Sequence, residues 1–536
     1  ISIGEKSSLQ KLKKNFIAAR IAYKRSAVFV DYFFPAFRRS INGPDLQYSE
    51  DDNPDEIRDP HGFQVIERML FSGGDHVDRE ALSKEAKALE EIFFSISSAL
   101  VFDAMRSAVI RLVSLGITGF DSPVALNSIE ESRAALEGMA DVLSEYGETK
   151  SLAIARDAIN YLSAHNDFNS FDRLFFIRSF ADPLFGAITL AAKSSGSLLP
   201  DERHPLNNNS TSIFAEDFFD IDFFSPNRRY QVTPGRVALG KQLFYDSILS
   251  VSRKRSCASC HDPSKAFTDG LPAPASLAGT ATLKRNTPTL LNAAWQTKFF
   301  YDSRASTLEN QLNSVVHNAD EMEGSLKEAI RRIRQHAVYY PQFQKAYSAD
   351  PDPVTEYNIA NAISSYIRSL THYDSKFDRY MRGKGDLAPS EKKGFNLFAG
   401  KAKCGTCHYI PLFNGLVPPL FSETESEVIG VPANTQGVPQ HDADEGRFIF
   451  TRSVVHKHAF KTPTVRNVAL TAPYMHNGVF KSLEEVMDFY KKGGGAGTRT
   501  AFENETLPPD KLQLSKKEIK NIISFLKTLT DEPAQR

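Results

Sequence analysis

The chain has 536 residues, and its composition of 41% hydrophobic and 24% charged residues is typical of a globular protein with more than one domain. Its 64 lysines and arginines nearly balance its 65 aspartates and glutamates, so the net charge of -1 creates no overall field and predicts no nucleic-acid partner. No run of eighteen apolar residues occurs, and we therefore expect no transmembrane segment.

Residues 1–198 contain no cysteine and have the 3.6-residue periodicity of amphipathic helices. Between residues 81 and 115, apolar side chains recur on one face of such a helix, at Leu89, Ile92, Phe93, Ile96, Leu100 and Phe102. This pattern predicts an antiparallel α-helical bundle. The polar residues 199–231, with Pro200, Pro205 and Pro226, are expected to form a linker after the bundle.

The next region, residues 232–385, has clear helix signals at both ends. Thr233 before Pro234 predicts the start of a helix that runs to Phe244, because a threonine cap followed by proline is favoured at a helix N-terminus. A second helix is expected near residues 355–380. We treat this region as one domain.

The last region, residues 386–536, repeats the same layout. Ser390 is predicted to be the N-cap of a helix that ends at Phe398, and Ser515 the N-cap of an amphipathic helix that ends at Leu529. We treat this region as a second domain of the same kind.

All four cysteines lie in two pentads of the form Cys-x-x-Cys-His, namely Cys257-Ala-Ser-Cys260-His261 and Cys404-Gly-Thr-Cys407-His408. In this motif two thiols attach to the vinyl groups of one porphyrin, and the adjacent histidine reaches the iron. A lone Cys-x-x-Cys also occurs in redox dithiols and zinc sites, but neither needs the following histidine. The sequence thus predicts two covalently bound c-type haems.

Five motifs between the pentads and around them appear in an order typical of one family: Leu239-Gly-Lys-Gln-Leu-Phe244, Arg285-Asn-Thr-Pro-Thr-Leu-Leu-Asn292, Tyr301-Asp-Ser-Arg-Ala305, Asn318-Ala-Asp-Glu-Met322 and Phe460-Lys-Thr-Pro-Thr-Val-Arg-Asn467. With them, residues 235–531 resemble the bacterial di-haem cytochrome c peroxidase and MauG superfamily. The resemblance implies a mainly α fold with two cytochrome c-like haem domains, the first peroxidatic and the second for electron transfer, preceded by the helical bundle.

The bundle itself resembles imelysin-like domains less specifically, through Ala19-Arg-Ile-Ala-Tyr23 and Gly62-Phe-Gln-Val-Ile-Glu67. Gln64 stands where that family usually has histidine, so no metal site is carried over. We expect a structural bundle or a docking surface.

The family resemblance implies that the first haem is the peroxide site. Glu321 matches the distal acid-base residue, and Gln311 matches the distal glutamine. Cleavage of a bound peroxide needs a group that takes a proton from one oxygen and returns it to the other, and a carboxylate in a partly dry pocket suits that role. The alternative for Glu321 is a solvated acid beside Asp320 and Glu323.

Many family members close the first haem with a histidine in the loop before Arg285. This chain has no histidine between His261 and His317, and the matching position is about Ala278. We therefore expect the first iron to be five-coordinate and open to peroxide.

An aromatic relay between the haems is also implied. Tyr301 stands where the family usually has tryptophan, and a tyrosine must lose a proton when it passes an electron. The single tryptophan, Trp295, is expected to pack in the core or against haem, with a substitute relay as the alternative.

Two further ligand sets follow from the resemblance. Asn286, with the carbonyls of Thr471 and Pro473, matches a calcium site, for which oxygen ligands are suitable; loop capping by Asn286 is the alternative. Tyr490, fourteen residues after His476, matches the tyrosine that MauG-type members use on the second iron opposite His408. Met487 on the same helix face is the rival ligand, and packing is the other alternative for Tyr490.

We therefore predict a di-haem peroxidase or oxidase that uses H₂O₂ at the first haem, with the second haem storing or relaying oxidising equivalents. A small electron-donor protein, such as a cytochrome c or cupredoxin, would supply electrons; in the MauG-like alternative, a protein or organic substrate is oxidised. A non-catalytic electron carrier is the remaining alternative. Because c-type haem is attached outside the cytoplasmic membrane, we expect a bacterial periplasmic protein, and the absence of a signal pattern at Ile1 is typical of a mature or trimmed chain.

Overall fold

The structure is a computed structural model that describes residues 8–72, 100–197 and 204–531. The chain divides into two compact units. Unit 1 contains Ile1–Phe218, Ala388–Phe413 and Val417–Phe421, and unit 2 contains Phe219–Leu387, Asn414–Leu416 and Ser422–Arg536. The predicted domain boundaries are drawn from sequence motifs, whereas these units are defined by contacts in space. The boundaries therefore stay a prediction.

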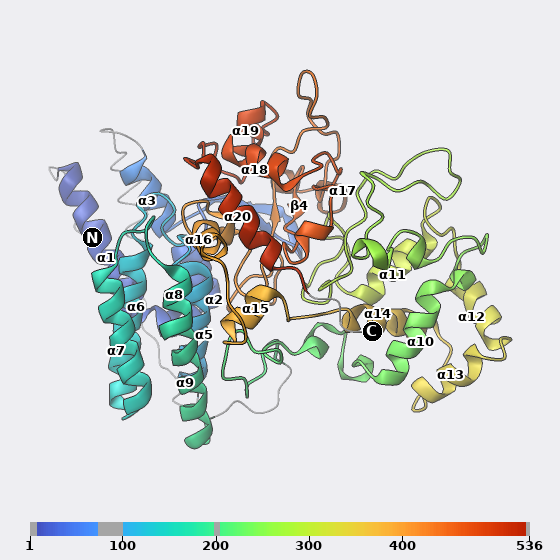
Figure 1. Cartoon of the computed structure of the whole chain (residues 1–536), viewed down its shortest axis with the longest axis horizontal. Coiled ribbons are helices and arrows are strands. Elements are labelled where there is room, and N and C mark those ends of the chain that lie inside the picture. The colour runs from blue at the N-terminus through green and yellow to red at the C-terminus, as the bar shows by residue number, and fades with distance from the viewer. Residues whose placement is uncertain (1–7, 73–99, 198–203, 532–536) are drawn as a thin grey trace. The chain divides into compact units, whose positions relative to one another are not determined.

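Unit 1 is a helical bundle with a short two-stranded sheet (Figure 1). Its helices are α1 (Leu9–Phe33), α2 (Pro35–Asn42), α3 (Phe63–Phe71), α5 (Val101–Arg111), α6 (Ser128–Glu145), α7 (Thr149–Ala164), α8 (Arg173–Phe176), α9 (Asp182–Ser194) and α16 (Pro389–Phe398). Strands β1 (Tyr48–Glu50) and β2 (Asn53–Arg58) pair antiparallel. Helix α6 packs between α1 and α7, and α5 contacts both α1 and α9. The prediction for residues 81–115 falls partly on residues 73–99, which lie outside the described residues.

Two π-helical turns interrupt the bundle, η2 (Leu112–Gly116) after α5 and η3 (Ile177–Ala181) after α8. Such turns insert one extra residue into a helix and are frequent at functional sites. Among the described residues, one continuous helix, Arg173–Ser194, has the length and hydropathy of a membrane span, and 61% of that window is buried inside the protein. The expected lack of a transmembrane segment stays a prediction.

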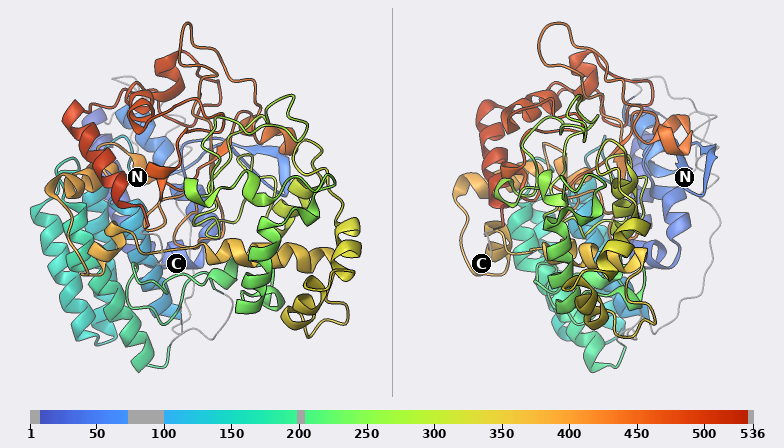
Figure 2. Two further views of the ribbon diagram at one scale, coloured as in Figure 1. Left: turned by 45° about the vertical axis from the view of Figure 1, so that its right-hand side comes forward. Right: turned by 90° about the vertical axis from the view of Figure 1, so that its right-hand side faces the viewer.

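Unit 2 contains the remaining helices and long loops (Figures 1 and 2). Its α-helices are α10 (Pro234–Tyr245), α11 (Leu308–His317), α12 (Leu326–Arg334), α13 (Tyr339–Ala346), α14 (Glu356–Ser369), α15 (Lys376–Met381), α17 (Phe448–Thr451), α18 (Leu483–Lys491), α19 (Gly494–Thr498) and α20 (Lys516–Thr528). Strands β3 (Ser426–Glu427) and β4 (Phe460–Lys461) pair antiparallel. The predicted mainly α fold is confirmed.

The core of unit 2 forms where α10 and α14 cross. A Cβ atom on Gly240 would lie 1.8 Å from the carbonyl oxygen of Ala362, so only glycine allows this approach. Buried side chains on both helices, among them Leu243 and Ile363, continue this core. The crossing fixes the loop that follows α10, which carries the first cysteine motif.

The helix starts test the predicted caps. Thr233 accepts a hydrogen bond from the Arg236 amide, and Ser515 forms a capping box with Glu518, so both predicted N-caps are confirmed. The Ser390 prediction is wrong, because α16 begins at Pro389 and the side chain of Glu391 accepts from the Ala388 amide.

The helix predicted near residues 355–380 is two helices. Thr355 caps α14 as its sequence suggests, but this helix ends at Ser369. Ser375 then starts α15, since its hydroxyl and amide both bond to the Asp378 carboxylate in a second capping box.

Candidate active site

The first cysteine motif forms a tight turn, η7 (Cys257–Ser259). The amides of Cys260 and His261 both donate to the Cys257 carbonyl, at 3.2 and 3.0 Å. Neither thiol is in a disulfide. Burial raises the pKa of the Cys257 thiol to about 12, which favours the protonated form of the sulfur. The turn thus presents two free thiols beside a histidine.

A backbone carbonyl orients His261. Its Nδ1 lies 3.0 Å from the carbonyl oxygen of Phe267. Because a carbonyl only accepts hydrogen bonds, Nδ1 carries the proton in this contact, and in the neutral ring the lone pair is on Nε2. Burial lowers the pKa of His261, which favours the neutral ring. A neutral imidazole fixed in this way is suited to bind iron.

The predicted acid-base residue lies close to this turn. The negative charge of Glu321 and the positive charge of Arg255 both act on the Cys260 thiol. The Asn318 side-chain amide donates to Glu321 Oε1 at 2.7 Å, and burial raises the pKa of the half-buried Glu321 carboxyl. Gln311 lies on α11, the helix that leads into this segment. A carboxyl group with a raised pKa is suited to exchange protons near neutral pH.

Arg255 ties the acid-base segment to the loop that carries Ala278. Its guanidinium donates to the Ser276 carbonyl at 3.0 Å and to the Glu321 carbonyl at 3.3 Å. In addition, the Leu277 amide donates to the Asp320 carbonyl at 2.6 Å. Arg255 belongs to no motif in the sequence, and its role follows only from the fold.

Tyr301 and Asn286 meet in unit 2. The Tyr301 hydroxyl donates to Asn286 Oδ1 at 3.4 Å, and burial raises the pKa of Tyr301. The backbone amide of Asn286 donates to the His476 carbonyl at 2.7 Å, which places Asn286 near the segment that carries Thr471 and Pro473. Hydrogen bonds within the described residues leave the Thr471 and Pro473 carbonyls unused. These two carbonyl oxygens are therefore available for a cation, whereas Asn286 Oδ1 already accepts from Tyr301, and the calcium site stays a prediction.

Trp295 is buried, with 5% of its surface exposed. Its ring packs against Tyr373 at a centroid distance of 5.4 Å and against Phe219 at 5.8 Å. Its indole Nε1 finds no hydrogen-bond partner among the described residues. These contacts are those of a core residue, as expected, and the relay alternative stays untested.

The second cysteine motif repeats the turn of the first. In η9 (Cys404–Thr406), the amides of Cys407 and His408 donate to the Cys404 carbonyl at 3.3 and 3.0 Å. Neither thiol forms a disulfide, and burial again raises the pKa of the first cysteine, Cys404, to about 12. This motif belongs to unit 1, together with the N-terminal bundle.

Tyr490 belongs to unit 2, so its pairing with His408 stays a prediction. It lies on α18 and packs half-buried against the cluster of Val431, Phe480 and Phe489. Met487 on the same helix is buried, with 4% of its surface exposed. Leu483 and Met487 are buried, whereas Tyr490 on the same helix face is half-buried, so packing stays an alternative for Tyr490.

Comparison with known proteins agrees with the motifs. Residues 234–386 match the family model for di-haem cytochrome c peroxidase. The methylamine utilization protein MauG of Methylorubrum extorquens is 35% identical over 304 residues, which cover 56% of this chain and 80% of that protein. The cytochrome-c peroxidase IdrP1 of Pseudomonas sp. (strain SCT) is 36% identical over 318 residues, which cover 55% of this chain and 80% of that protein.

A solved structure of a MauG-like protein associated with microbial copper homeostasis is also similar, with 30% identity and a TM-score of 0.49 over 56% of this chain and 91% of that one. The sequence relatives define the class of protein, an oxidoreductase of the di-haem peroxidase type. The chain belongs to the di-haem cytochrome c peroxidase and MauG superfamily.

Proposed function

We propose that this protein uses hydrogen peroxide as an oxidant at its first haem and passes the oxidising equivalents on through its second. The observation that carries the proposal is the neighbourhood of the first cysteine turn. A neutral, carbonyl-anchored His261 and a carboxyl group with a raised pKa, Glu321, lie around the same pair of thiols.

The residues present fit two covalently bound haems. Cys257, Cys260 and His261 would hold the first, and Cys404, Cys407 and His408 would hold the second, because none of the four thiols is in a disulfide and each pair precedes a histidine. When bound, each haem supplies an iron that exchanges single electrons. Because thioether attachment of haem takes place outside the cytoplasmic membrane, this proposal includes a bacterial periplasmic location.

Glu321 moves the protons of the reaction. As carboxylate it takes a proton from one peroxide oxygen, and as acid it returns that proton to the oxygen that leaves as water. The overall reduction, H₂O₂ + 2 H⁺ + 2 e⁻ → 2 H₂O, consumes two electrons. Asn318 holds the carboxylate in place at 2.7 Å, and Gln311, on the helix that leads into this segment, would orient peroxide with its amide.

The distal side of the first haem is open in this proposal. The loop that would supply a closing histidine carries the exposed Ala278 instead, and it is held against the acid-base segment by Arg255. Peroxide therefore meets the ferric enzyme without prior reduction.

The electrons come from a small donor protein, a cytochrome c or cupredoxin, or from a protein or organic substrate as in MauG-like enzymes. The presence of Tyr490 fourteen residues after His476, where MauG-type members have their tyrosine ligand, favours the second course. A phenolate on the second iron would stabilise its oxidised states, whereas a thioether would stabilise the ferrous state. Tyr301 would relay the electrons, and a calcium ion held by Asn286, Thr471 and Pro473 would fix the loops around it.

The experiment is rapid mixing of the ferric protein with H₂O₂, after pyridine haemochrome analysis has counted the haems. We expect two haems, a high-spin ferric component at rest, and a spectral change on mixing. A wholly low-spin protein that reacts only after one-electron reduction would show that the first iron is closed. A protein that never reacts with peroxide would be an electron carrier.

A further inference from the structure

One loop of unit 1, residues 117–125, lies between the polar core of the bundle and the second cysteine motif. It connects the π-helical turn η2 to α6. On one side it is fixed by buried charged side chains, and on the other it contacts residues 403–409. We first describe the two sets of contacts separately.

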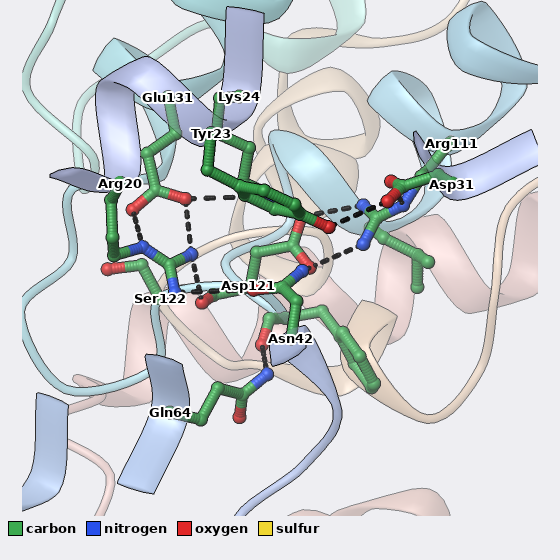
Figure 3. A network of polar contacts seen from close by, with 12 residues as sticks. Arg20, Tyr23, Lys24, Asp31, Asn42, Gln64, Arg111, Asp121, Ser122 and Glu131 are labelled. Atoms are coloured by element: carbon green, nitrogen blue, oxygen red, sulfur yellow. Dashed lines mark hydrogen bonds and ion pairs between the residues drawn. The ribbon is translucent and has the colours of Figure 1, made fainter. Parts of the chain in front are cut away.

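Asp121 is the centre of the first set (Figure 3). It is 1% exposed, and its carboxylate accepts from Lys24 at 2.6 Å, from Arg111 at 2.6 and 2.9 Å, and from Asn42 at 2.9 Å. Its carbonyl accepts from Arg20 at 2.7 Å. Three helices of the bundle, α1, α2 and α5, therefore converge on one loop residue.

The flanking loop residues are tied down as well. The Gln64 side chain donates to the Phe120 carbonyl at 3.1 Å. Glu67, which is fully buried, accepts from the Ser122 hydroxyl at 2.6 Å and from the Ala125 amide at 2.8 Å. The two polar residues of the Gly62–Glu67 motif thus hold the loop backbone from α3.

Charges in this core compensate one another. Arg20 pairs with Glu131 at 2.5 Å, and Arg111 pairs with Asp31 at 2.5 Å as well as with Asp121. Each of these carboxylates is already engaged by a cationic side chain. These paired charges are typical of a structural network, and they leave no carboxylate among the three for a bound cation.

The second set of contacts joins this scaffold to the second cysteine motif. The Ser114 hydroxyl of η2 donates to the Ile410 carbonyl at 2.6 Å, and Lys403 Nζ donates to the Pro123 carbonyl at 3.2 Å. A Cβ atom on Gly405 would lie 3.4 Å from the Thr118 methyl group. The rings of Phe120 and Tyr409 meet edge to face at 6.0 Å.

Arg173 secures the same segment from the start of α8. Its guanidinium is fully buried and donates to the carbonyls of Ile117, Phe168 and Phe171 at 2.7 to 3.2 Å. It packs flat on the backbone at Gly400, where a Cβ atom would come within 2.4 Å of Nη1. Both π-helical turns of the bundle, η2 and η3, occur next to these contacts, where an altered helical register re-aims side chains.

We infer that the polar core of the N-terminal bundle positions the second haem-attachment segment through η2 and residues 117–125, with Asp121 as the central positioning residue. The bundle then helps to position the second haem. This inference rests on the proposed function only in taking Cys404, Cys407 and His408 as the attachment residues of that haem.

The test compares three variants of the full-length two-haem protein. Asp121→Asn removes the negative charge that pairs with Lys24 and Arg111. Ser114→Ala removes only the hydrogen bond to the Ile410 carbonyl. Asp103→Asn is the matched control, because Asp103 is a buried acid of the same bundle that pairs with Arg106 and Tyr32. Asp103 lies about 12 Å along α5 from Arg111.

The readouts are the reduction potential and paramagnetic resonance spectrum of each haem. For Asp121→Asn we expect the ferric to ferrous ratio of the second haem at a fixed potential to change roughly two- to thirtyfold, the range for residues that act through packed neighbours. Ser114→Ala should give a smaller change. The first haem, and both haems of Asp103→Asn, should keep the wild-type values.

Unchanged second-haem values in Ser114→Ala and Asp121→Asn, with both haems attached, would overturn the inference. If Asp121→Asn does not fold, Ser114→Ala alone decides. Equal changes at both haems would also overturn it, since they would indicate general loosening. A wild-type protein with one haem would instead refute the proposed function, and haemochrome analysis separates that result from the others.

Discussion

The two cysteine motifs have the same turn but different neighbours. Around Cys257–His261, the contacting groups come from unit 2: Phe267 anchors the histidine, and Glu321 and Arg255 lie beside Cys260. Around Cys404–His408, the contacts described within unit 1 come from a helical bundle nearly 300 positions away in sequence, as in the bond from Ser114 to Ile410.

Under the proposed function, this difference teaches that the pentad would only attach the cofactor, while its neighbours would determine what the cofactor can do. The first turn has titratable groups that can move protons, as peroxide cleavage requires. The contacts of the second turn with the bundle are side-chain hydrogen bonds to backbone carbonyls and packing, which fix position. The family model, residues 234–386, includes the first turn and ends before the second.

The largest effect should come from Glu321→Gln, which keeps the shape of the side chain and removes its ability to accept a proton. We expect both haems to remain and peroxide cleavage to slow by about 10²- to 10⁴-fold, the usual cost of losing a general acid-base. Rapid mixing with H₂O₂ measures the rate. Glu323→Gln, two positions on and exposed, is the control and should react normally. An unchanged rate in Glu321→Gln would contradict the proposal that the first cysteine turn, unlike the second, has a neighbouring group that transfers protons.

The second comparison concerns Tyr490 and Met487. Tyr490→Phe should change the low-spin spectrum and raise the potential of the second haem, because under the proposed assignment it removes a phenolate ligand that stabilises the ferric state. Met487→Leu should leave both unchanged and affect only packing, since Met487 is buried in the core. Optical and paramagnetic resonance spectra measure the result. If only Met487→Leu alters these spectra, the ligand is the methionine, and the argument for a MauG-like oxidase is lost.

Much of the local structure could be predicted from the sequence. Thr233 and Ser515 cap helices where their side chains and spacing indicate, and the cysteine pentads form the same turn twice. Capping and turn formation depend on residues a few positions apart, so the sequence contains the whole cause. At α16 two local signals competed, and Pro389, which is favoured at the first helical position, shifted the start away from Ser390.

The site could be predicted only where a motif spans it. Glu321 and Asn318 are three positions apart, and their contact follows from that spacing. Arg255 and the bundle residues Ser114 and Asp121 act across distant parts of the chain, and their identities alone give no sign of a role. Long-range contacts depend on how the helices pack, which local patterns do not determine.

The third comparison uses one glycine from each unit, Gly240 in unit 2 and Gly400 in unit 1. Gly240→Ala would place a Cβ 1.8 Å from the Ala362 carbonyl oxygen and should cost about 2 kcal/mol net, because overpacking of about 3 exceeds a helix-propensity gain of about 1. Gly400→Ala meets the side chain of Arg173 instead, and should cost about 1 kcal/mol. Denaturant unfolding measures both.

Gly385→Ala is the control for these glycines, since the nearest atom to its Cβ would be 4.0 Å away and its stability should change by no more than about 0.5 kcal/mol. Gly400→Ala should also disturb the second haem spectrum, and Gly240→Ala should not. A disturbed second haem in Gly240→Ala alone would contradict the separate support of the two turns.

The smallest effect concerns the pH dependence of the first site. Burial raises the pKa of Glu321, so the reaction with peroxide should fail as the pH falls through a value above that of an ordinary glutamate, where the carboxylate takes up its proton. The Asn318 amide opposes this shift by donating to the carboxylate. Asn318→Ala should therefore raise the pKa further and move the acid limb of the rate profile to higher pH.

Well above that limb, where Glu321 is ionised in both proteins, the rates of Asn318→Ala and wild type should converge. Asn310→Ala, an exposed change on α11, is the control and should leave the limb in place. Glu321→Gln should abolish the limb altogether. A limb that stays fixed or moves to lower pH in Asn318→Ala would mean that a different group titrates, and the proton-handling role that distinguishes the first turn from the second would belong to that group.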